Sequence, residues 1–374
     1  MRFLKLIKLF VLALCVISCQ ASHEFSVYVG DDNKSISQSQ YFEFKRIVAL
    51  GGGESKESII RKVDRVLLLN DRIVVSDVVG NHVLLFDSKG NFLASTDAMI
   101  GKGNNEYVHV QDCAIDTERQ LIYMYCERPY QFYVFDSNLK LLSCIKVKDY
   151  ISELTMDQKY LYAYCVKDGN TSYELRMYDK TKLDGSYKTL LKYNEGIRGV
   201  RGMGRVLCGS DEYISFAMPF SNVIYRIGRG EVKNSLSIDF ANGWFTYSDS
   251  KKLSGRSFLS SNKGKKWIIQ NIHTSDSIMF FNTNDAPFCM VNMKNGSGDS
   301  YKYFTGTYLP YSVSWFTPCS SKQGWVVMEM SVEAVRDYIK YCKEKNKEMV
   351  DAIKQLNVVD STTNPVLLFM QFRK

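Results

Sequence analysis

Residues 72–95 read RIVVSDVVGNHVLLFDSKGNFLAS, and residues 121–144 read LIYMYCERPYQFYVFDSNLKLLSC. An offset of 49 residues, from 72 to 121, aligns the two stretches without a gap and places Phe86-Asp87-Ser88 on Phe135-Asp136-Ser137. A third copy follows, in which Tyr178-Asp179-Lys180 takes the same place. Self-similarity at a fixed period indicates a repeat architecture.

Each copy consists of short runs rich in β-branched and aromatic residues, separated by turn residues such as Ser88-Lys89-Gly90-Asn91. Weaker copies occupy 213–227 and 277–294, and a sixth begins at Trp325. Four short strands in about 45–50 residues is the period of a propeller blade. The sequence therefore predicts an all-β protein, a six-bladed β-propeller. The aspartate that recurs in three copies predicts a turn cap at Asp87, Asp136 and Asp179.

Closure of the ring is also predicted. The run at 41–50, YFEFKRIVAL, precedes the first repeat, and the run at 364–372, NPVLLFMQF, ends the chain. Strand-like runs at 311–316 and 325–330 leave the last unit one strand short. We expect 41–50 to supply it, because joining the first and last strands in one blade removes two sheet edges.

One segment breaks the β pattern. From 331 to about 356, apolar residues recur at the spacing of one helix face, and Ser331 is of the type that caps helices. The sequence predicts a helical insertion in the last blade, packed on the propeller. A helix that binds a partner is the alternative.

The N-terminus carries an export signal. Basic residues precede the apolar run 9–17, which is too short to cross a hydrocarbon core of about 30 Å. The run ends in Val16-Ile17-Ser18-Cys19, which resembles a bacterial lipobox. We predict a signal peptide over 1–18 and lipidation of Cys19. An ordinary secretory signal, or acylation of Cys15, is the alternative.

The predicted organisation is then a flexible tether over 19–40 and the propeller over 41–374, lipid-anchored to a bacterial membrane in the cell envelope. The inner and outer membranes are both open. Removing 1–18 leaves 45 basic against 40 acidic residues, a net charge of +5. So small a net charge argues against a protein that binds nucleic acid. We also expect the protein to be a monomer.

Chemical signatures are sparse. Of the ten cysteines, eight follow Cys19 without a C-x-x-C or Cys/His cluster, and several lie in apolar runs. We interpret them as small buried side chains, with disulfides as the alternative. The four histidines form no H-E-x-x-H or H-x-H pattern. No catalytic residue, metal site or cofactor is therefore assigned.

Two segments carry candidate ligand-binding residues. Residues 196–205, GIRGVRGMGR, hold four glycines that let backbone N–H groups approach a ligand, and three arginines that bind carboxylate or phosphate. The pattern suggests an anion-binding lip of Arg198, Arg201 and Arg205, with a flexible connection as the alternative. Glu106 in the loop 101–107 is a further candidate for ligand binding, if its side chain faces the channel. The alternative is that the loop is only a turn between two blades. The basic stretch 251–266 is interpreted as a solvated loop, with contact to a polyanion as the alternative.

The loop 101–107, GKGNNEY, followed by a strand pair ending in Phe135-Asp136, resembles the NHL-type repeat. It is more similar to the bacterial six-bladed β-propeller lipoproteins, in which a G-x-G-P-G-E-Y-like loop links the first blades. In this chain Asn104-Asn105 replace Pro-Gly. The NPVL ending at 364–367 is also similar, and the resemblance covers nearly all of 41–372. NHL-like propellers include a histidine-dependent lyase, but this chain has no matching histidines.

These observations predict a binding module that acts through the loops at the channel mouth of the propeller. A carbohydrate, a peptide or a protein is the expected ligand. The alternative is a channel-mouth enzyme, such as a lyase or a glycan-acting hydrolase.

Overall fold

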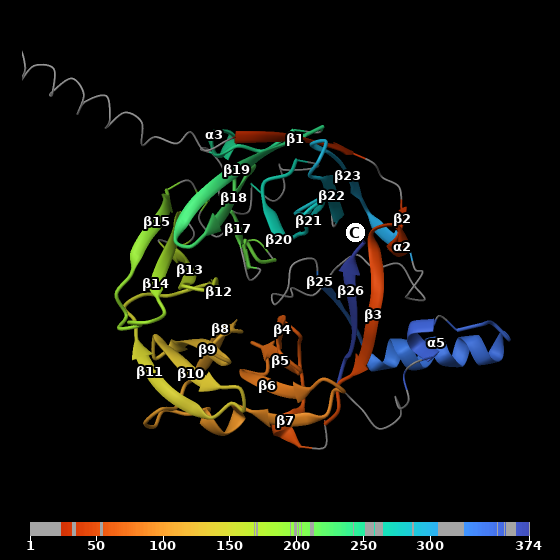
Figure 1. Cartoon of the computed structure of the whole chain (residues 1–374), viewed down its shortest axis with the longest axis horizontal. Coiled ribbons are helices and arrows are strands. Elements are labelled where there is room, and N and C mark those ends of the chain that lie inside the picture. The colour runs from red at the N-terminus through yellow and green to blue at the C-terminus, as the bar shows by residue number, and fades with distance from the viewer. Residues whose placement is uncertain are drawn as a thin grey trace, which may run out of the picture.

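The computed structural model shows strands standing side by side around a central axis (Figure 1). It describes residues 24–31, 35–52, 55–167, 169, 171–194, 196–197, 200, 202, 204–209, 213–241, 243–250, 258, 265–285, 288–305, 325–349, 351–354, 356 and 364–373. The predicted signal peptide, Cys19 and the strand expected at 311–316 lie outside these ranges.

Three antiparallel sheets have four strands each, which follow one another in chain order from the channel outward. Blade one is β4 (Arg65–Leu69), β5 (Arg72–Asp77), β6 (His82–Asp87) and β7 (Phe92–Ser95). Blade two is β8 (His109–Asp116), β9 (Leu121–Arg128), β10 (Gln131–Asp136) and β11 (Leu141–Lys146). Blade three is β12 (Glu153–Met156), β13 (Tyr160–Lys167), β14 (Ser172–Asp179) and β15 (Lys188–Tyr193).

Two further four-stranded arrays share one nine-stranded sheet. Blade four is β16 (Leu207–Gly209), β17 (Ile214–Ala217), β18 (Val223–Gly228) and β19 (Glu231–Phe240). Blade five is β20 (Ile269–Thr274), β21 (Ile278–Thr283), β22 (Phe288–Asn292) and β23 (Ser297–Tyr301). The strand β1 (Glu24–Asp31) joins them. A closing sheet contains β25 (Trp325–Met330), β26 (Val366–Phe372) and β3 (Phe42–Ala49).

The remaining described elements are short. They are β2 (Ser35–Ser37), paired with β24 (Tyr303–Thr305), the 3-10 turns η1 (Lys56–Ser58) and η2 (Asp97–Met99), and the helices α2 (Gln38–Tyr41), α3 (Tyr247–Ser250), α5 (Val332–Glu344) and α6 (Asp351–Lys354). The predicted fold class, an all-β propeller with a helical insertion before the last strand, is confirmed.

The unbroken apolar runs of the repeats follow from packing on both faces of each blade. Leu84 and Leu85 in β6 are adjacent and fully buried, and they point to opposite faces of the strand. Leu84 belongs to the apolar cluster shared with the closing sheet, and Leu85 belongs to the cluster shared with blade two. A blade held between two neighbours therefore needs apolar residues on both faces of its inner strands.

The recurring aspartates cap turns, as predicted. Asp87 Oδ1 accepts hydrogen bonds from the N–H groups of Lys89 and Asn91, both at 2.9 Å. Asp136 accepts from the corresponding N–H groups of its turn, at 2.8 and 2.9 Å, and Asp179 accepts from Thr181 N–H at 2.8 Å. The carboxylate thus holds the hairpin between the third and fourth strands of each blade.

Replacing Asp87 by alanine should lower the free energy of unfolding by about 1 kcal/mol at pH 7, because several hydrogen bonds to an ionised acceptor are lost. Burial alone would raise the pKa of Asp87, but hydrogen bonds from Asn91, Lys89 and Gly90 outweigh it and lower the pKa. The difference between wild type and variant should therefore be complete above about pH 5 and shrink as the pH falls below about 4. Urea titrations at pH 7 and 3 test this, with Asp71→Ala in the neighbouring turn as the control. A difference that grows in acid would contradict it.

The ring closes as predicted, with β3 as the outer strand beside β26. The two strands are antiparallel, with Val366 opposite Ala49 and Phe372 opposite Phe42. The buried Asn364 side chain adds a clasp, because its Oδ1 accepts from Ile60 N–H at 2.9 Å and its Nδ2 donates to Ser58 O at 2.7 Å. These bonds tie the last strand to the entrance of blade one.

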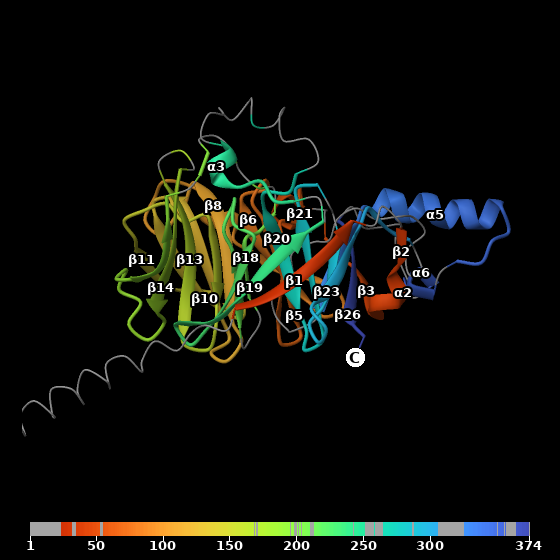
Figure 2. The same ribbon diagram turned by 90° about the horizontal axis from the view of Figure 1, so that it is seen from above.

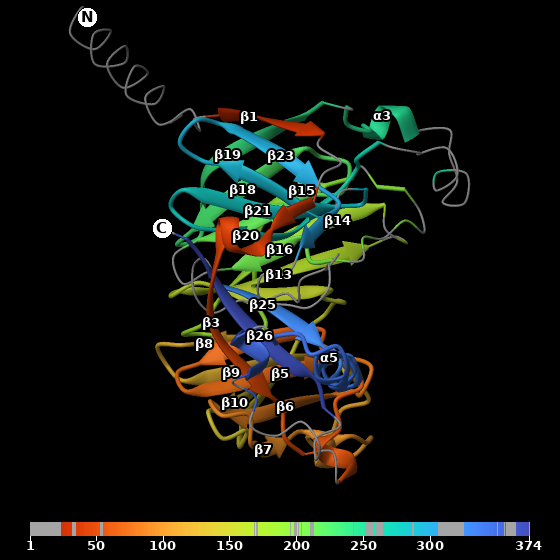
Figure 3. The same cartoon turned by 90° about the vertical axis from the view of Figure 1, so that its right-hand side faces the viewer.

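The flexible tether predicted over 19–40 is wrong where the structure describes it. Strand β1 lies between β19 and β23, parallel to both, and Val27 and Val29 are fully buried. Figures 1 and 3 show β1 and then β3 along the outside of the ring. The segment after the predicted anchor is therefore part of the propeller.

The helical insertion is two helices, not the one continuous helix predicted from 331 to about 356. Ser331 caps α5 as expected, because its Oγ accepts from Ala334 N–H at 3.1 Å. The helix ends before Asn346, whose φ of 48° lies in the left-handed region that terminates helices. Valines 332 and 335 of α5 are buried in the cluster shared with the closing sheet.

Seven cysteines are described, and none of them forms a disulfide. Five are buried, and burial raises the pKa of Cys126 and Cys165, as expected for small buried side chains. Cys319 lies outside the described ranges. Among the described helices, none is long and apolar enough to cross a membrane.

Candidate functional site

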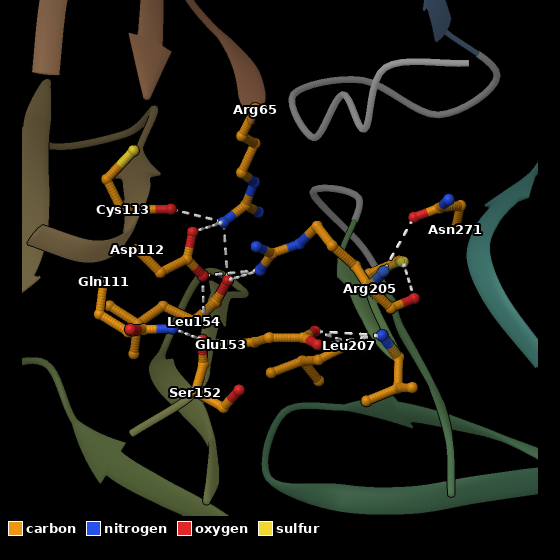
Figure 4. Close-up of polar contacts among 12 residues, drawn as sticks. Arg65, Gln111, Asp112, Cys113, Ser152, Glu153, Leu154, Arg205, Leu207 and Asn271 are labelled. Carbon is orange, nitrogen blue, oxygen red and sulfur yellow. Dashed lines mark hydrogen bonds and ion pairs between the residues drawn. The ribbon is translucent and has the colours of Figure 1, made fainter. Parts of the chain in front are cut away.

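Charged side chains from four blades meet where the innermost strands begin. Arg65 is the first residue of β4, Glu153 is the first residue of β12, Arg205 comes two residues before β16, and Asp112 lies within β8. Figure 4 shows their side chains pointing toward one another. We call Arg65, Asp112, Glu153 and Arg205 the channel cluster.

Asp112 lies at the centre of the cluster and is 3% exposed. Its Oδ2 accepts from Leu154 N–H at 2.5 Å and from Arg205 Nη2 at 2.7 Å. Its Oδ1 lies 3.5 Å from Arg65 Nη1. The Asp112 carboxylate therefore interacts with two guanidinium groups and one backbone N–H group. These contacts link blades one, two, three and four.

Arg65 is almost completely buried, with 1% of its side chain exposed. Its Nη1 donates to Cys113 O at 2.5 Å and to Leu154 O at 2.8 Å. Burial lowers the pKa of Arg65, and the neighbouring charge of Arg205 lowers it further. A buried cation of this kind is stable only while its carboxylate partner is present.

Arg205 is fixed at both its side chain and its backbone. Its Nη2 donates to Asp112 and, at 2.9 Å, to Leu154 O. Its backbone N–H donates to Asn271 Oδ1 at 2.9 Å, and its carbonyl accepts from Asn271 N–H at 2.6 Å. A Cβ on Gly204 would lie 2.7 Å from Asn271 Nδ2, which explains the glycine before the arginine. The Arg205 side chain is 14% exposed.

Glu153 completes the cluster. Its carboxyl group accepts from Val206 N–H at 3.1 Å and from Leu207 N–H at 2.9 Å. Burial raises the pKa of Glu153, although the charge of Arg205 and these N–H groups oppose the rise. Burial acts to lower the pKa of Arg205, but Asp112 and Glu153 outweigh it and raise it. The cluster thus contains two arginines, Arg65 and Arg205, together with Asp112 and Glu153, and the pKa of Glu153 is raised.

Of the three arginines of the predicted anion-binding lip, the structure describes only Arg205. Its guanidinium group lies in the channel cluster and is bonded to Asp112, and the lip itself stays a prediction. Arg198 and Arg201 lie outside the described residues. Most of the basic stretch 251–266 also lies outside them.

Glu106 lies in the turn that connects blades one and two, and its role in ligand binding stays a prediction. Its Oε2 accepts from Gly103 N–H at 2.6 Å, and a Cβ on Gly101 would collide with the same carboxylate oxygen. Its carbonyl accepts from Tyr133 Oη at 2.6 Å. The two glycines leave room for the carboxylate, which holds the loop in shape.

A cavity of about 680 Å³ lies beside this loop. It is bounded by the loop, by the turn between β9 and β10, and by the outermost strand β11. Tyr130 contributes an exposed aromatic ring and Lys102, Arg128 and Lys146 contribute exposed cationic side chains. The cavity is therefore on the outer part of blade two, away from the channel cluster.

Sequence reasoning missed Arg65, Asp112, Glu153 and Asn271. The repeats were aligned on the second, third and fourth strands, so the first strands were not compared with one another. A charged residue followed by mainly apolar residues stands at the start of β4 and β12 and two residues before β16, at Arg65, Glu153 and Arg205. That pattern is the signal that would have found them.

The described residues contain no group of three His, Cys, Asp or Glu side chains that could hold a metal ion. The fold and the cluster define a β-propeller whose channel is lined by a polar network. The chain belongs to the family described as "Domain of unknown function (DUF4934)", which matches residues 25–371. The predicted propeller fold is supported, whereas membership of the NHL-like lipoproteins that the sequence resembles is not. No curated protein matches the chain.

One solved structure is similar in fold. It is a protein of Bacteroides fragilis NCTC 9343 named "Putative exported protein", which is 12% identical with a TM-score of 0.73, over 93% of this chain and 100% of that chain. At this identity the likeness concerns the fold alone. BamB from Moraxella catarrhalis is 10% identical with a TM-score of 0.42, over 76% and 75% of the two chains. The β-propeller domain of Cps50 (Swd1) from Myceliophteria thermophila is 11% identical with a TM-score of 0.37, over 60% and 62%.

Proposed function

We propose that the protein is an exported lipoprotein of the cell envelope and that its propeller binds an acidic ligand at the channel cluster. The lipobox-like sequence ending at Cys19 supports the anchor, and the exported relative from Bacteroides supports export. The count of six blades, with the closing sheet as the sixth, belongs to the same proposal.

The observation that supports the proposal is which nitrogens of the Arg205 guanidinium group are hydrogen-bonded. Both side-chain bonds use Nη2, and among the described residues no hydrogen bond occupies Nε or Nη1. Because 14% of the side chain is exposed, these nitrogens can meet a ligand from the channel. The fixed backbone and the bond to Asp112 hold the guanidinium group in one place, so little entropy is lost on binding.

The ligand class follows from the donors that Arg205 offers. Its guanidinium group is cationic, and its Nε and Nη1 donors are of the kind that binds a carboxylate or phosphate group. An acidic carbohydrate, an acidic peptide and an acidic side chain of a protein all present such a group.

Titration calorimetry with two probes, hexaglutamate and an oligogalacturonate, tests this proposal. For the probe that binds, Arg205→Gln and Arg205→Lys should each weaken affinity by roughly tenfold to a hundredfold, because a charge-assisted hydrogen bond contributes about 1.5–3 kcal/mol. Lysine keeps the charge beside Asp112 and loses the planar fork. Arg229→Gln, an exposed arginine at a distant turn, is the matched control. Unchanged affinity in both folded Arg205 variants, or no binding of either probe by wild type, would contradict the proposal.

The alternative of a channel-mouth enzyme has one residue in its favour. Glu153 has a raised pKa, which suits a general acid of a glycan-acting hydrolase. Its carboxyl oxygens, however, accept backbone N–H groups from Val206 and Leu207. This arrangement supports a structural acceptor, so binding is the function that we propose.

A further inference from the structure

Strand β1 is fixed into the ring, so it restricts where the membrane anchor can lie. It pairs with β19 from Glu24 opposite Ser235 to Val29 opposite Phe240, and with β23 from Tyr28 opposite Ser297. Its buried side chains pack in the apolar cluster that blades four and five share. The first described residue is therefore already part of a rigid body.

The direction of β1 sets which end of the ring it starts from. It is parallel to β19, and three successive antiparallel pairings make β19 antiparallel to β16. Arg205 comes just before β16, so β1 ends near the Arg205 end and starts from the opposite end. Figure 2 shows β1 rising from the side of the C-terminal end toward the side that carries α3.

The distance to the anchor is short. Four residues separate Cys19 from Glu24. The five residue-to-residue steps between the two span at most about 17 Å when the chain is fully extended. An eight-residue strand such as β1 is about 26 Å long. The anchor therefore cannot reach past the ring to the Arg205 end.

From this geometry we propose that the end of the propeller from which β1 starts docks on the lipid bilayer, so that the channel cluster points away from it. The proposal rests on lipidation of Cys19. The docking surface includes the β18–β19 turn (228–231) and the β22–β23 turn (292–297). Arg229 and Lys294 at these turns are exposed and can meet lipid phosphate groups.

Hydrogen exchange on the full-length lipidated protein tests the orientation. The protein is placed in vesicles of phosphatidylethanolamine and phosphatidylglycerol and compared with a soluble form that starts at residue 20. We expect peptides covering 228–231 and 292–297 to exchange several-fold more slowly on vesicles. The loop 101–107, which leads into β8 at the Arg205 end, should exchange at the same rate in both forms.

A spacer variant separates docking from anchoring. Twenty Gly/Ser residues inserted between 23 and 24 add about 25 Å of flexible reach, so protection of both turns should be lost while the lipid is kept. The same spacer appended after residue 374 is the control and should leave protection intact. Mass spectrometry of the N-terminal peptide reports acylation separately. An unacylated Cys19 would overturn the anchor and the docking together, whereas acylation with equal exchange at both ends would overturn the docking alone.

Discussion

Replacing Asp112 by asparagine is expected to lower the free energy of unfolding by about 3–5 kcal/mol, far more than a typical surface substitution does. The variant removes the negative charge that lies 3.5 Å from Arg65, whose side chain is only 1% exposed. Arg205 loses its 2.7 Å partner at the same time. Denaturant unfolding followed by circular dichroism measures the loss.

Two further variants make this expectation specific. Asp136→Asn changes an exposed turn carboxylate in the same blade and should cost much less. The double variant Asp112→Leu with Arg65→Met removes the more deeply buried cation together with the carboxylate, so that only Arg205, which is 14% exposed, loses its partner. It should therefore be more stable than Asp112→Asn. Equal stability of Asp112→Asn and wild type would show that the cluster contributes little to the ring.

Deleting residues 42–49 should abolish cooperative unfolding of the whole ring. The deletion removes β3, exposes the full edge of β26, and takes the buried Phe42 and Val48 out of two apolar clusters. An exposed edge of this length also favours aggregation. Calorimetry and sedimentation of the truncated protein measure the effect, and a soluble monomer with an unchanged Tm would contradict the closure.

A milder substitution tests the same contact in a protein that still folds. Phe42 packs against Phe372, with ring centroids 5.2 Å apart, and Phe42→Ala should cost about 3–5 kcal/mol. Tyr341→Ala on the exposed face of α5 is the matched control and should have little effect.

The sequence predicted the blades well because their inner strands are packed on both faces. Apolar runs such as 83–86 are long enough to recognise, and the capping aspartates mark their ends. Closure by 41–50 was predictable for a related reason, since a strand-like run stood outside any repeat. Strand β1 was missed because its only partners are parallel strands more than 200 residues away, and no local pattern reports such pairing.

The channel cluster was harder to predict for a different reason. Its members stand one per blade, and the intervals between them vary with loop length. Asp112 acts on Arg65 and Arg205, which belong to different blades, so the interaction exists only after the ring has formed. The glycine-arginine segment did point to Arg205, but its carboxylate partner could not be seen from that segment.

The clasp made by Asn364 has a consequence for the order in which the fold forms. Its bond to Ile60 spans 304 residues of chain. Strand β26 is separated even further from β3, because Val366 pairs with Ala49 and Phe372 pairs with Phe42. Contacts of such long sequence separation form slowly. We therefore expect closure of the ring to be a late step of folding, which follows the formation of the individual blades.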